Sequence, residues 1–359
     1  MGAKLTDRPS DYTFGKRKLR WPWLIGAAVV ALALIAVGGY VVFRRNGGPT
    51  GTPEFSDTNT VAAQTARRLD GVPVATDKAN LLPLAIVVEN HSSVRPQSGL
   101  SKAGVVYEAL AEGGITRFLA IFATTGEVTI GPVRSARPYL VQLAREYNGM
   151  FVHAGTSPQA RTEIQKSSIT DFDQFSKPYN FTRLKGTARP LEHTLFTNLH
   201  LLELGRNSLK LKNEGVYDGW IFKADAPAAT PTTKPITIDY STPAYKVTYT
   251  YDAKTNTYPR SQANAPAVDK TGNVRVAPKN VVVMFTTSTL FDSLRRNIVV
   301  VGEGKLLVFQ DGQVVTGTWK KEGSATRLQF LDSTGAALAL NRGQTWVQVV
   351  DVPEKNVTY

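Results

Sequence analysis

The feature that most constrains this chain is a stretch of 21 residues without a charge, WLIGAAVVALALIAVGGYVVF, from Trp23 to Phe43. At a rise of about 1.5 Å per residue, a helix of this length crosses a hydrocarbon core of about 30 Å. Six Lys and Arg residues precede the stretch and two follow it. Because cytoplasmic flanks carry the excess of positive charge, we predict a cytoplasmic tail over 1–22, one transmembrane helix over 23–43 and an extracytoplasmic remainder.

A cleaved signal peptide is the alternative interpretation of this stretch. The apolar region of a signal peptide spans only about 7–15 residues and is followed by small residues at the cleavage site. The stretch here is longer and ends in Tyr-Val-Val-Phe. We therefore expect an uncleaved, single-pass anchor in the cell membrane.

Composition narrows the classes of protein that the chain can represent. With 42% hydrophobic and 20% charged residues, it is typical of a globular protein. The net charge of +13 favours anionic partners, but no basic run with interleaved aromatic residues predicts nucleic-acid binding. The chain has no cysteine, which excludes disulfides, a thiolate nucleophile, cysteine metal ligands and attachment of a lipid through cysteine.

Two segments rich in Gly, Pro, Thr and Ala divide the outer part. Residues 44–75 predict a flexible tether, and residues 224–235 a linker. Between them, residues 76–223 alternate apolar strands with helical patterns, which predicts an α+β (or α/β) ligand-binding domain. Residues 236–359 contain short β-branched and aromatic runs, which predict a smaller, β-rich domain.

Local signals predict the elements of the first domain. LAIVVE (84–89) is a continuous apolar run and predicts a central strand. Residues 104–122 predict two strands joined at Gly113-Gly114, with a helix over 101–112 as the alternative. A strand at 150–155 and three helices follow, with Ser135, Ser157 and Thr197 as their expected N-caps. In the second domain, Asp311-Gly312 predicts a hairpin.

The alternation of side chains along the predicted hairpin places several charged residues of the first domain on one face. If Gly113-Gly114 is a two-residue turn, Glu108, Glu112 and Arg117 share one face of the hairpin. Two carboxylates beside one cation suit an acid–base pair, of the kind that glycosidases use. The alternative, which spacing alone favours, is a salt-bridge cluster that supports the sheet.

Two arginines flank the expected start of a helix in GPVRSARPY. Arg134 and Arg137 lie where the helix dipole is positive, so a cation costs about 0.3–1 kcal/mol there unless an anion compensates. A phosphate or carboxylate ligand would supply that anion. Glu108 or Glu112 is the alternative anion.

Polar side chains also follow two predicted strands. Asn90 and His91 end the first, with Arg95 just beyond, and His153 ends the second. If the two strands are parallel, these side chains face one crevice together with Ser157 and Arg161. His193, in a predicted loop, completes a set of three histidines, but no close His pairing supports a metal site. We expect hydrogen-bonding or general-base roles, with no metal and no cofactor.

The motif run IVVENHSSVRPQSGLSKAGVVYEALAEGGITRFLAIF, followed by GPVRSARPY and VHAGTSPQA, resembles the YerB-type family of bacterial proteins, which are named as lipoproteins. The resemblance covers residues from about 76 to the end and implies two consecutive domains of unknown function in an extracytoplasmic envelope protein. It assigns no catalytic residue. The absence of cysteine sets this chain apart from lipid-anchored members.

Together these patterns predict an Arg/His/Glu-lined crevice for an anionic ligand, an envelope glycan or a phosphate-bearing polymer. The ligand-binding candidates are Asn90, His91, Arg95, Arg117, Arg134 and Arg137. If the protein is an enzyme, a hydrolase or transferase acting on envelope polymers, the catalytic candidates are Glu108, Glu112 and His153. The alternative is a non-catalytic interaction module or scaffold for membrane-bound cell-wall synthesis proteins.

Overall fold

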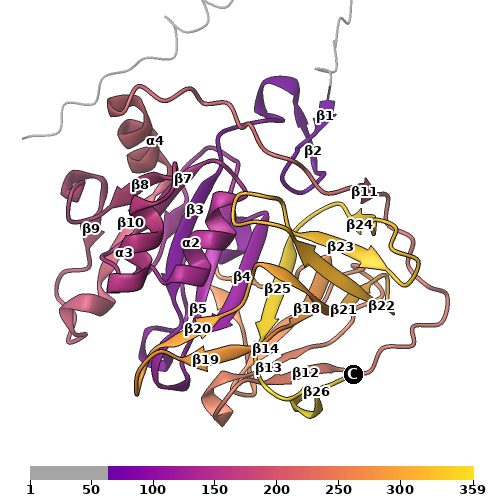
Figure 1. Ribbon diagram of the computed structural model, residues 1–359. Helices are drawn as coiled ribbons and strands as arrows, with labels where there is room; N and C mark the ends of the chain where they lie inside the picture. Colours follow the sequence, from indigo (N-terminus) through magenta and orange to yellow (C-terminus); the bar gives the residue numbers. More distant parts are fainter. Residues whose placement is uncertain (1–63) are drawn as a thin grey trace, which may run out of the picture. The chain divides into compact units, whose positions relative to one another are not determined.

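A ten-stranded sheet runs through both halves of the sequence (Figure 1). The computed structural model describes residues 64–359, which belong to one compact unit. The sheet order is β23-β22-β21-β18-β25-β4-β5-β3-β7-β8. Five strands come from the first half: β3 (Leu84–Glu89), β4 (Val105–Leu110), β5 (Thr116–Phe122), β7 (Met150–His153) and β8 (Thr170–Asp173). The other five are β18 (Asn280–Phe285), β21 (Gly302–Gln310), β22 (Gln313–Lys321), β23 (Gln329–Asp332) and β25 (Thr345–Val350).

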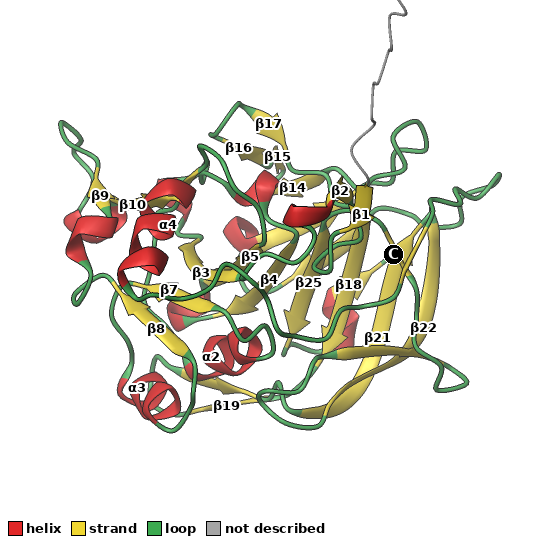
Figure 2. Cartoon of the chain, turned by 90° about the horizontal axis from the view of Figure 1, so that it is seen from above, coloured by secondary structure: helices red, strands yellow, loops and turns green. Residues whose placement is uncertain are grey.

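The halves join where β25 pairs with β4 in parallel, with Val347 opposite Tyr107. Figure 2, seen from above, shows strands of both halves in one continuous row. A single buried apolar cluster contains residues from both halves. The sequence break at 224–235 therefore does not separate two cores. Ala226 and Ala228 of that segment donate backbone hydrogen bonds to Asp311, which ties it to the β21–β22 turn.

Three α-helices occur in the described residues, all from the first half: α2 (Pro138–Arg145), α3 (Pro158–Gln165) and α4 (Leu199–Ser208). Ser157 caps α3 as predicted. The other two expected caps are wrong. The N-cap of α2 is Arg137, because the Ser135 hydroxyl donates to the Ala154 carbonyl instead. Asn198 caps α4 and accepts from Leu201 N–H, because the helix begins at Leu199 and the Thr197 hydroxyl donates to the Asn180 carbonyl.

Smaller sheets surround the central one. The largest is β15-β14-β13-β12-β26, built from β12 (Ile236–Asp239), β13 (Lys246–Tyr249), β14 (Arg260–Gln262), β15 (Ala265–Pro266) and β26 (Val357–Thr358). A three-stranded sheet contains β6 (Thr129–Ile130), β10 (Leu195–Asn198) and β9 (Thr182–Arg183). Pairs of short strands are β11 (Phe222–Lys223) with β24 (Leu340–Asn341), β16 (Val268–Asp269) with β17 (Val274–Arg275), and β19 (Ser288–Leu290) with β20 (Arg296–Ile298).

The predicted tether extends too far into the chain. Its last part forms β1 (Gln64–Ala66) and β2 (Pro73–Ala75), which pair with each other. Leu69 and Asp70 between them are buried, and the Asp70 carboxylate is held by Arg67 at 2.5 Å. The polar composition of this segment concealed these contacts. The tail, the anchor and most of the tether lie outside the described residues, and no helix within 64–359 is long and apolar enough to cross a membrane.

The β4–β5 hairpin has a different register from the predicted one. The loop contains three residues, Glu112 to Gly114, and is closed by a hydrogen bond from Ala111 N–H to Ile115 C=O. Arg117 therefore pairs with Ala109 and Phe118 pairs with Glu108. A shift of one residue moves every side chain to the opposite face, so Glu108 and Arg117 lie on opposite faces of the sheet. The predicted turn at Asp311-Gly312 is confirmed, with both residues at positive φ.

Glu108 and Arg260 link the central sheet to the β12–β14 sheet. Both side chains are buried, and their charged groups approach to 2.9 Å. The guanidinium also lies 4.9 Å from the Trp346 ring, and the Tyr240 hydroxyl donates to the Glu108 carbonyl. Glu108 therefore holds two layers of the fold together.

We predict that Glu108→Ala lowers the free energy of unfolding by about 3–5 kcal/mol, because it leaves the buried Arg260 charge without its carboxylate. Urea denaturation followed by far-ultraviolet circular dichroism measures the change. The matched control is Lys305→Ala, which breaks an exposed pair with Glu354 and should cost no more than about 1 kcal/mol. Equal effects of the two substitutions would contradict the assigned role of Glu108.

Candidate functional site

The carboxyl ends of six strands meet at one edge of the sheet. The pairings of β8, β7 and β3 are parallel, as are those of β4, β25 and β18. Both sets are antiparallel to β5, so all six run in the same direction. Four of the nine predicted site residues, Asn90, His91, Arg95 and Glu112, lie in the loops that follow these ends. Parallel pairing of β3 and β7, on which the predicted crevice depended, is confirmed.

Glu112 gathers two arginines at this edge. Its carboxylate accepts from Arg117 at 3.1 Å and forms a second, close ion pair with Arg137, the N-cap of α2. Arg117 also donates to the Ser135 carbonyl at 2.9 Å. The anion that compensates Arg137 at the helix start is therefore an internal carboxylate, which was the alternative that the sequence left open.

The electrostatics of this group follow from burial and from its neighbours. Burial disfavours the charged form of Glu112, but Arg117 and Arg137 outweigh it and hold the pKa of the carboxyl below its usual value. Burial, together with the nearby Arg137, lowers the pKa of Arg117 to about 10. Glu112 and Arg117 therefore both remain charged at neutral pH.

A second group forms around Glu89, the last residue of β3. Its buried carboxylate lies 2.9 Å from Arg134 Nε and 2.8 Å from His193 Nδ1. The His193 ring stacks on His91, with centroids 5.1 Å apart. Because Glu89 and Arg117 are cross-strand partners, the two groups lie next to each other on one face of the sheet.

The Glu89–His193 pair has the geometry of an oriented general base. Nδ1 forms a hydrogen bond with the Glu89 carboxylate that fixes the ring, and Nε2 has no hydrogen bond to any described residue. Glu89 was not predicted as a site residue, and His193 was predicted only as one of three histidines with hydrogen-bonding or general-base roles. The signal was present in Glu89, a carboxylate at the end of an otherwise apolar strand, but its partner lies more than a hundred positions away.

Three predicted residues lie on the opposite face. Asn90 donates to Glu108 and Thr116, and its side-chain oxygen accepts from Arg95 at 3.1 Å. Arg95 also donates to the Ala244 carbonyl in the second half. Asn90, Arg95 and Glu108 therefore belong to the contact with the β12–β14 sheet, and the structure does not bring them to the carboxyl-edge site. Alternation along β3 explains this, because Asn90 follows Glu89.

His153 is placed at the expected edge but is enclosed. Nδ1 lies 2.9 Å from the Gly155 carbonyl and Nε2 lies 2.6 Å from Asp171, and the side chain is fully buried. Both ring nitrogens are occupied, so neither is available to a substrate. This argues against His153 as the acid or base.

A cavity of about 230 Å³ opens beside Arg137. Its walls come from α2, from α3 and from the β19–β20 hairpin. The lining residues are Arg137, Pro138, Gln142, Ser157, Gln159, Glu163, Phe291, Arg295, Arg296 and Asn297. Each of the three arginines is paired with a carboxylate that does not line the cavity, namely Glu112, Asp292 and Asp351. These carboxylates fix the guanidinium groups in place and leave Glu163 as the only acid of the lining.

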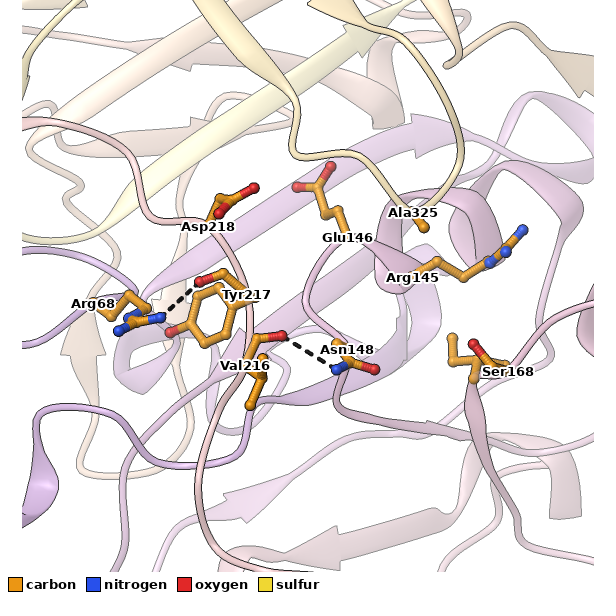
Figure 3. A pocket seen from close by; sticks show the side chains of 10 residues that line it. Arg68, Arg145, Glu146, Asn148, Ser168, Val216, Tyr217, Asp218 and Ala325 are labelled. Carbon is orange, nitrogen blue, oxygen red and sulfur yellow. Dashed lines mark hydrogen bonds between the residues drawn. The ribbon is translucent and has the colours of Figure 1, made fainter.

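Another cavity, of about 380 Å³, lies at the amino ends of β7 and β8 (Figure 3). Four of its polar side chains, those of Arg68, Arg145, Glu146 and Asn148, are engaged within the fold. Arg68 donates to the Tyr217 carbonyl at 3.0 Å, and Asn148 donates to the Val216 carbonyl at 3.2 Å, as the dashed lines show. Glu146 is buried between Lys321 and Arg327. None of the predicted site residues lines this cavity.

The described residues contain no group of three His, Asp or Glu side chains arranged to hold a metal ion. His91, His153 and His193 do not converge, because His153 is turned toward Asp171 on β8. The chemistry available at the carboxyl edge is therefore that of guanidinium groups, carboxylates, amides and one oriented imidazole.

Over residues 64–359 these features define a two-domain protein, mostly of strands with three α-helices, whose domains share a sheet and whose polar residues gather at one sheet edge. The chain belongs to the family described as "Protein of unknown function (DUF3048)". The N-terminal domain of that family matches residues 69–212 and the C-terminal domain matches residues 236–347. This confirms the expected resemblance and the presence of two consecutive domains.

Similarity to the YerB protein of Bacillus subtilis, in sequence and in structure, supports this assignment. The chain is 34% identical over 286 residues to "Putative lipoprotein YerB" of Bacillus subtilis (strain 168), covering 75% of this chain and 81% of that protein. The crystal structure of the Bacillus subtilis YerB protein superposes with a TM-score of 0.73 at 31% identity, covering 82% of this chain and 99% of that chain.

The lowered pKa of Glu112 predicts a pH-dependent contribution to stability. A carboxyl whose pKa is lower in the folded state stabilises the fold above its unfolded pKa and loses this effect as pH falls through the folded pKa. The stability lost in Glu112→Gln should therefore be constant above about pH 5.5 and should shrink as the pH falls below about 4.5. Urea denaturation of both proteins across this range measures the difference.

The control for this series is Glu214→Gln, at an exposed residue without an ion pair in the described chain. It should change stability by less than about 0.5 kcal/mol at every pH. A cost of Glu112→Gln that persists undiminished at pH 3 would show that its interactions with Arg117 and Arg137 do not depend on the carboxylate charge.

Proposed function

We propose that this protein is a membrane-anchored, extracytoplasmic envelope protein that binds an anionic ligand in the cavity beside Arg137. The ligand is an envelope glycan or a phosphate-bearing polymer. The observation that carries the proposal is the composition of the cavity lining, which contains three arginines and one carboxylate. Guanidinium groups recognise carboxylates and phosphates through paired hydrogen bonds, and the carboxylates behind these arginines orient them for that purpose.

Two findings support the proposed location. The similar Bacillus subtilis protein is named as a lipoprotein, which associates that relative with a membrane surface. In the present chain, which has no cysteine to carry a lipid, the apolar stretch from Trp23 to Phe43 supplies an anchor of sufficient length. With the N-terminus in the cytoplasm, the folded part of the chain lies on the outer side of the membrane.

Binding is favoured over catalysis by the state of the predicted catalytic residues. Glu108 and His153 are enclosed within the fold, and Glu112 is held between two arginines as a carboxylate. A general acid needs a proton at working pH, and the lowered pKa of Glu112 works against this role. The arginines of the cavity can bind a negatively charged ligand, so the geometry supports binding more directly than catalysis.

A second candidate function, docking of a protein of the membrane-bound cell-wall machinery, is favoured by the β19–β20 hairpin. Leu290, Phe291 and Leu294 are exposed at its turn. Exposed apolar side chains rimmed by polar residues are typical of interaction surfaces. Replacing Leu290 and Leu294 with Ser should leave anion binding intact, whereas it should weaken recruitment of a protein partner.

We predict that Arg137→Gln and Arg295→Gln each weaken the binding of an anionic polymer by about tenfold or more, because each removes a charge-assisted hydrogen-bonding group. Titration calorimetry of the full-length chain in detergent, with inorganic polyphosphate and with oligogalacturonate as probes, measures the affinities. Arg137→Lys keeps the charge without the planar fork and should give an intermediate loss.

Arg342→Gln is the matched control, because Arg342 is exposed and forms no ion pair with a described residue. It should retain the affinity of the unaltered protein within about twofold, as expected for an isolated surface charge. Unchanged affinity in both Arg137→Gln and Arg295→Gln would remove the cavity as the binding site.

A further inference from the structure

The loop that follows β8 carries the two most exposed large apolar side chains among residues 64–359. Tyr179 is 93% exposed and Phe175 is 74% exposed. Neither aromatic ring contributes to the core, and the Tyr179 hydroxyl has no hydrogen-bond partner in the described chain. The two rings therefore contribute little to the stability of the fold, and each exposes a broad apolar face to solvent.

Cations without an ion pair lie close to the two rings in the sequence. Lys177 lies between them, Arg183 ends β9, and Lys185 and Arg189 follow in the next loop. None of these four cations forms an ion pair within the described residues, in contrast to the paired arginines of the cavity. Over residues 174–192, Glu192 is the single acidic residue.

This region is continuous with the carboxyl-edge site. The Phe175 ring lies against Gly155, where an added Cβ would come within 3.2 Å of it. Gly155 is two residues before Ser157, which lines the cavity. On the other side, the carbonyl of Glu192 accepts from Arg134 at 3.4 Å, and His193 contacts Glu89. The loop after β8 therefore adjoins the carboxyl-edge site through Gly155 and Glu192.

We propose that Phe175, Tyr179 and the adjacent cations form a second subsite that binds the sugar rings of an acidic glycan. The inference rests on the proposed function and selects the glycan over a polymer without sugar rings. Aromatic faces stack against the apolar faces of sugars, while the basic side chains neutralise the acidic groups. A linear phosphate chain uses the cations but gains nothing from the rings.

The test compares three probes on the full-length chain in detergent: oligogalacturonate as an acidic sugar chain, inorganic polyphosphate, and neutral dextran. The double substitution Phe175→Ala/Tyr179→Ala should weaken oligogalacturonate binding by about tenfold and change polyphosphate binding by less than about twofold. Dextran should bind weakly to both proteins, since it offers no charge to the arginines. Circular dichroism confirms that the exposed substitutions leave the fold unchanged.

The matched aromatic control is Tyr359→Ala, which removes an exposed ring at the C-terminus, away from the loop. It should leave all affinities unchanged. Equal loss for oligogalacturonate and polyphosphate, or no loss for either, would overturn the glycan subsite. If Arg137→Gln still weakens the binding of both probes in that case, the proposed function stands. Absence of binding by oligogalacturonate and polyphosphate to the unaltered protein would overturn both proposals.

Discussion

The parallel pairing of β4 with β25 is the contact on which the rest of this structure depends. It joins strands that are more than two hundred positions apart and turns two sequence domains into one sheet with a single apolar core. The Glu108–Arg260 pair reinforces the joint from one face, because a buried carboxylate and a buried guanidinium each require the other. The site on the other face is therefore built on a framework that both halves supply.

This framework explains how the cavity acquires its charge. α2 and α3 begin after strands of the first half, whereas Arg295 and Arg296 come from the hairpin that follows β18 of the second half. Only the shared sheet brings them together. Each cavity arginine is held by a carboxylate set back from the lining, and this arrangement turns flexible surface side chains into oriented groups.

The two parts of the proposed binding surface differ in physical character. The cavity arginines are paired and partly buried, so they are suited to fixing the geometry of a ligand. The cations around Phe175 and Tyr179 are unpaired, so they attract negative charge over a longer range without fixing its position. An acidic sugar chain would use both properties, since its charge and its ring faces repeat along its length.

The sequence by itself determined the local elements: the buried run of β3, the start of α3 at Ser157, the turn at Asp311-Gly312, the two-domain layout and the family. These depend on neighbouring residues, and short-range rules suffice for them. The tertiary structure decided which charges meet. Because the loop after β4 has one residue more than predicted, Glu108 and Arg117 lie on opposite faces of the sheet. Glu89 contacts His193, which lies far from it in the sequence. Such pairings depend on register and on contacts distant in sequence, because a single-residue shift in a strand exchanges its two faces.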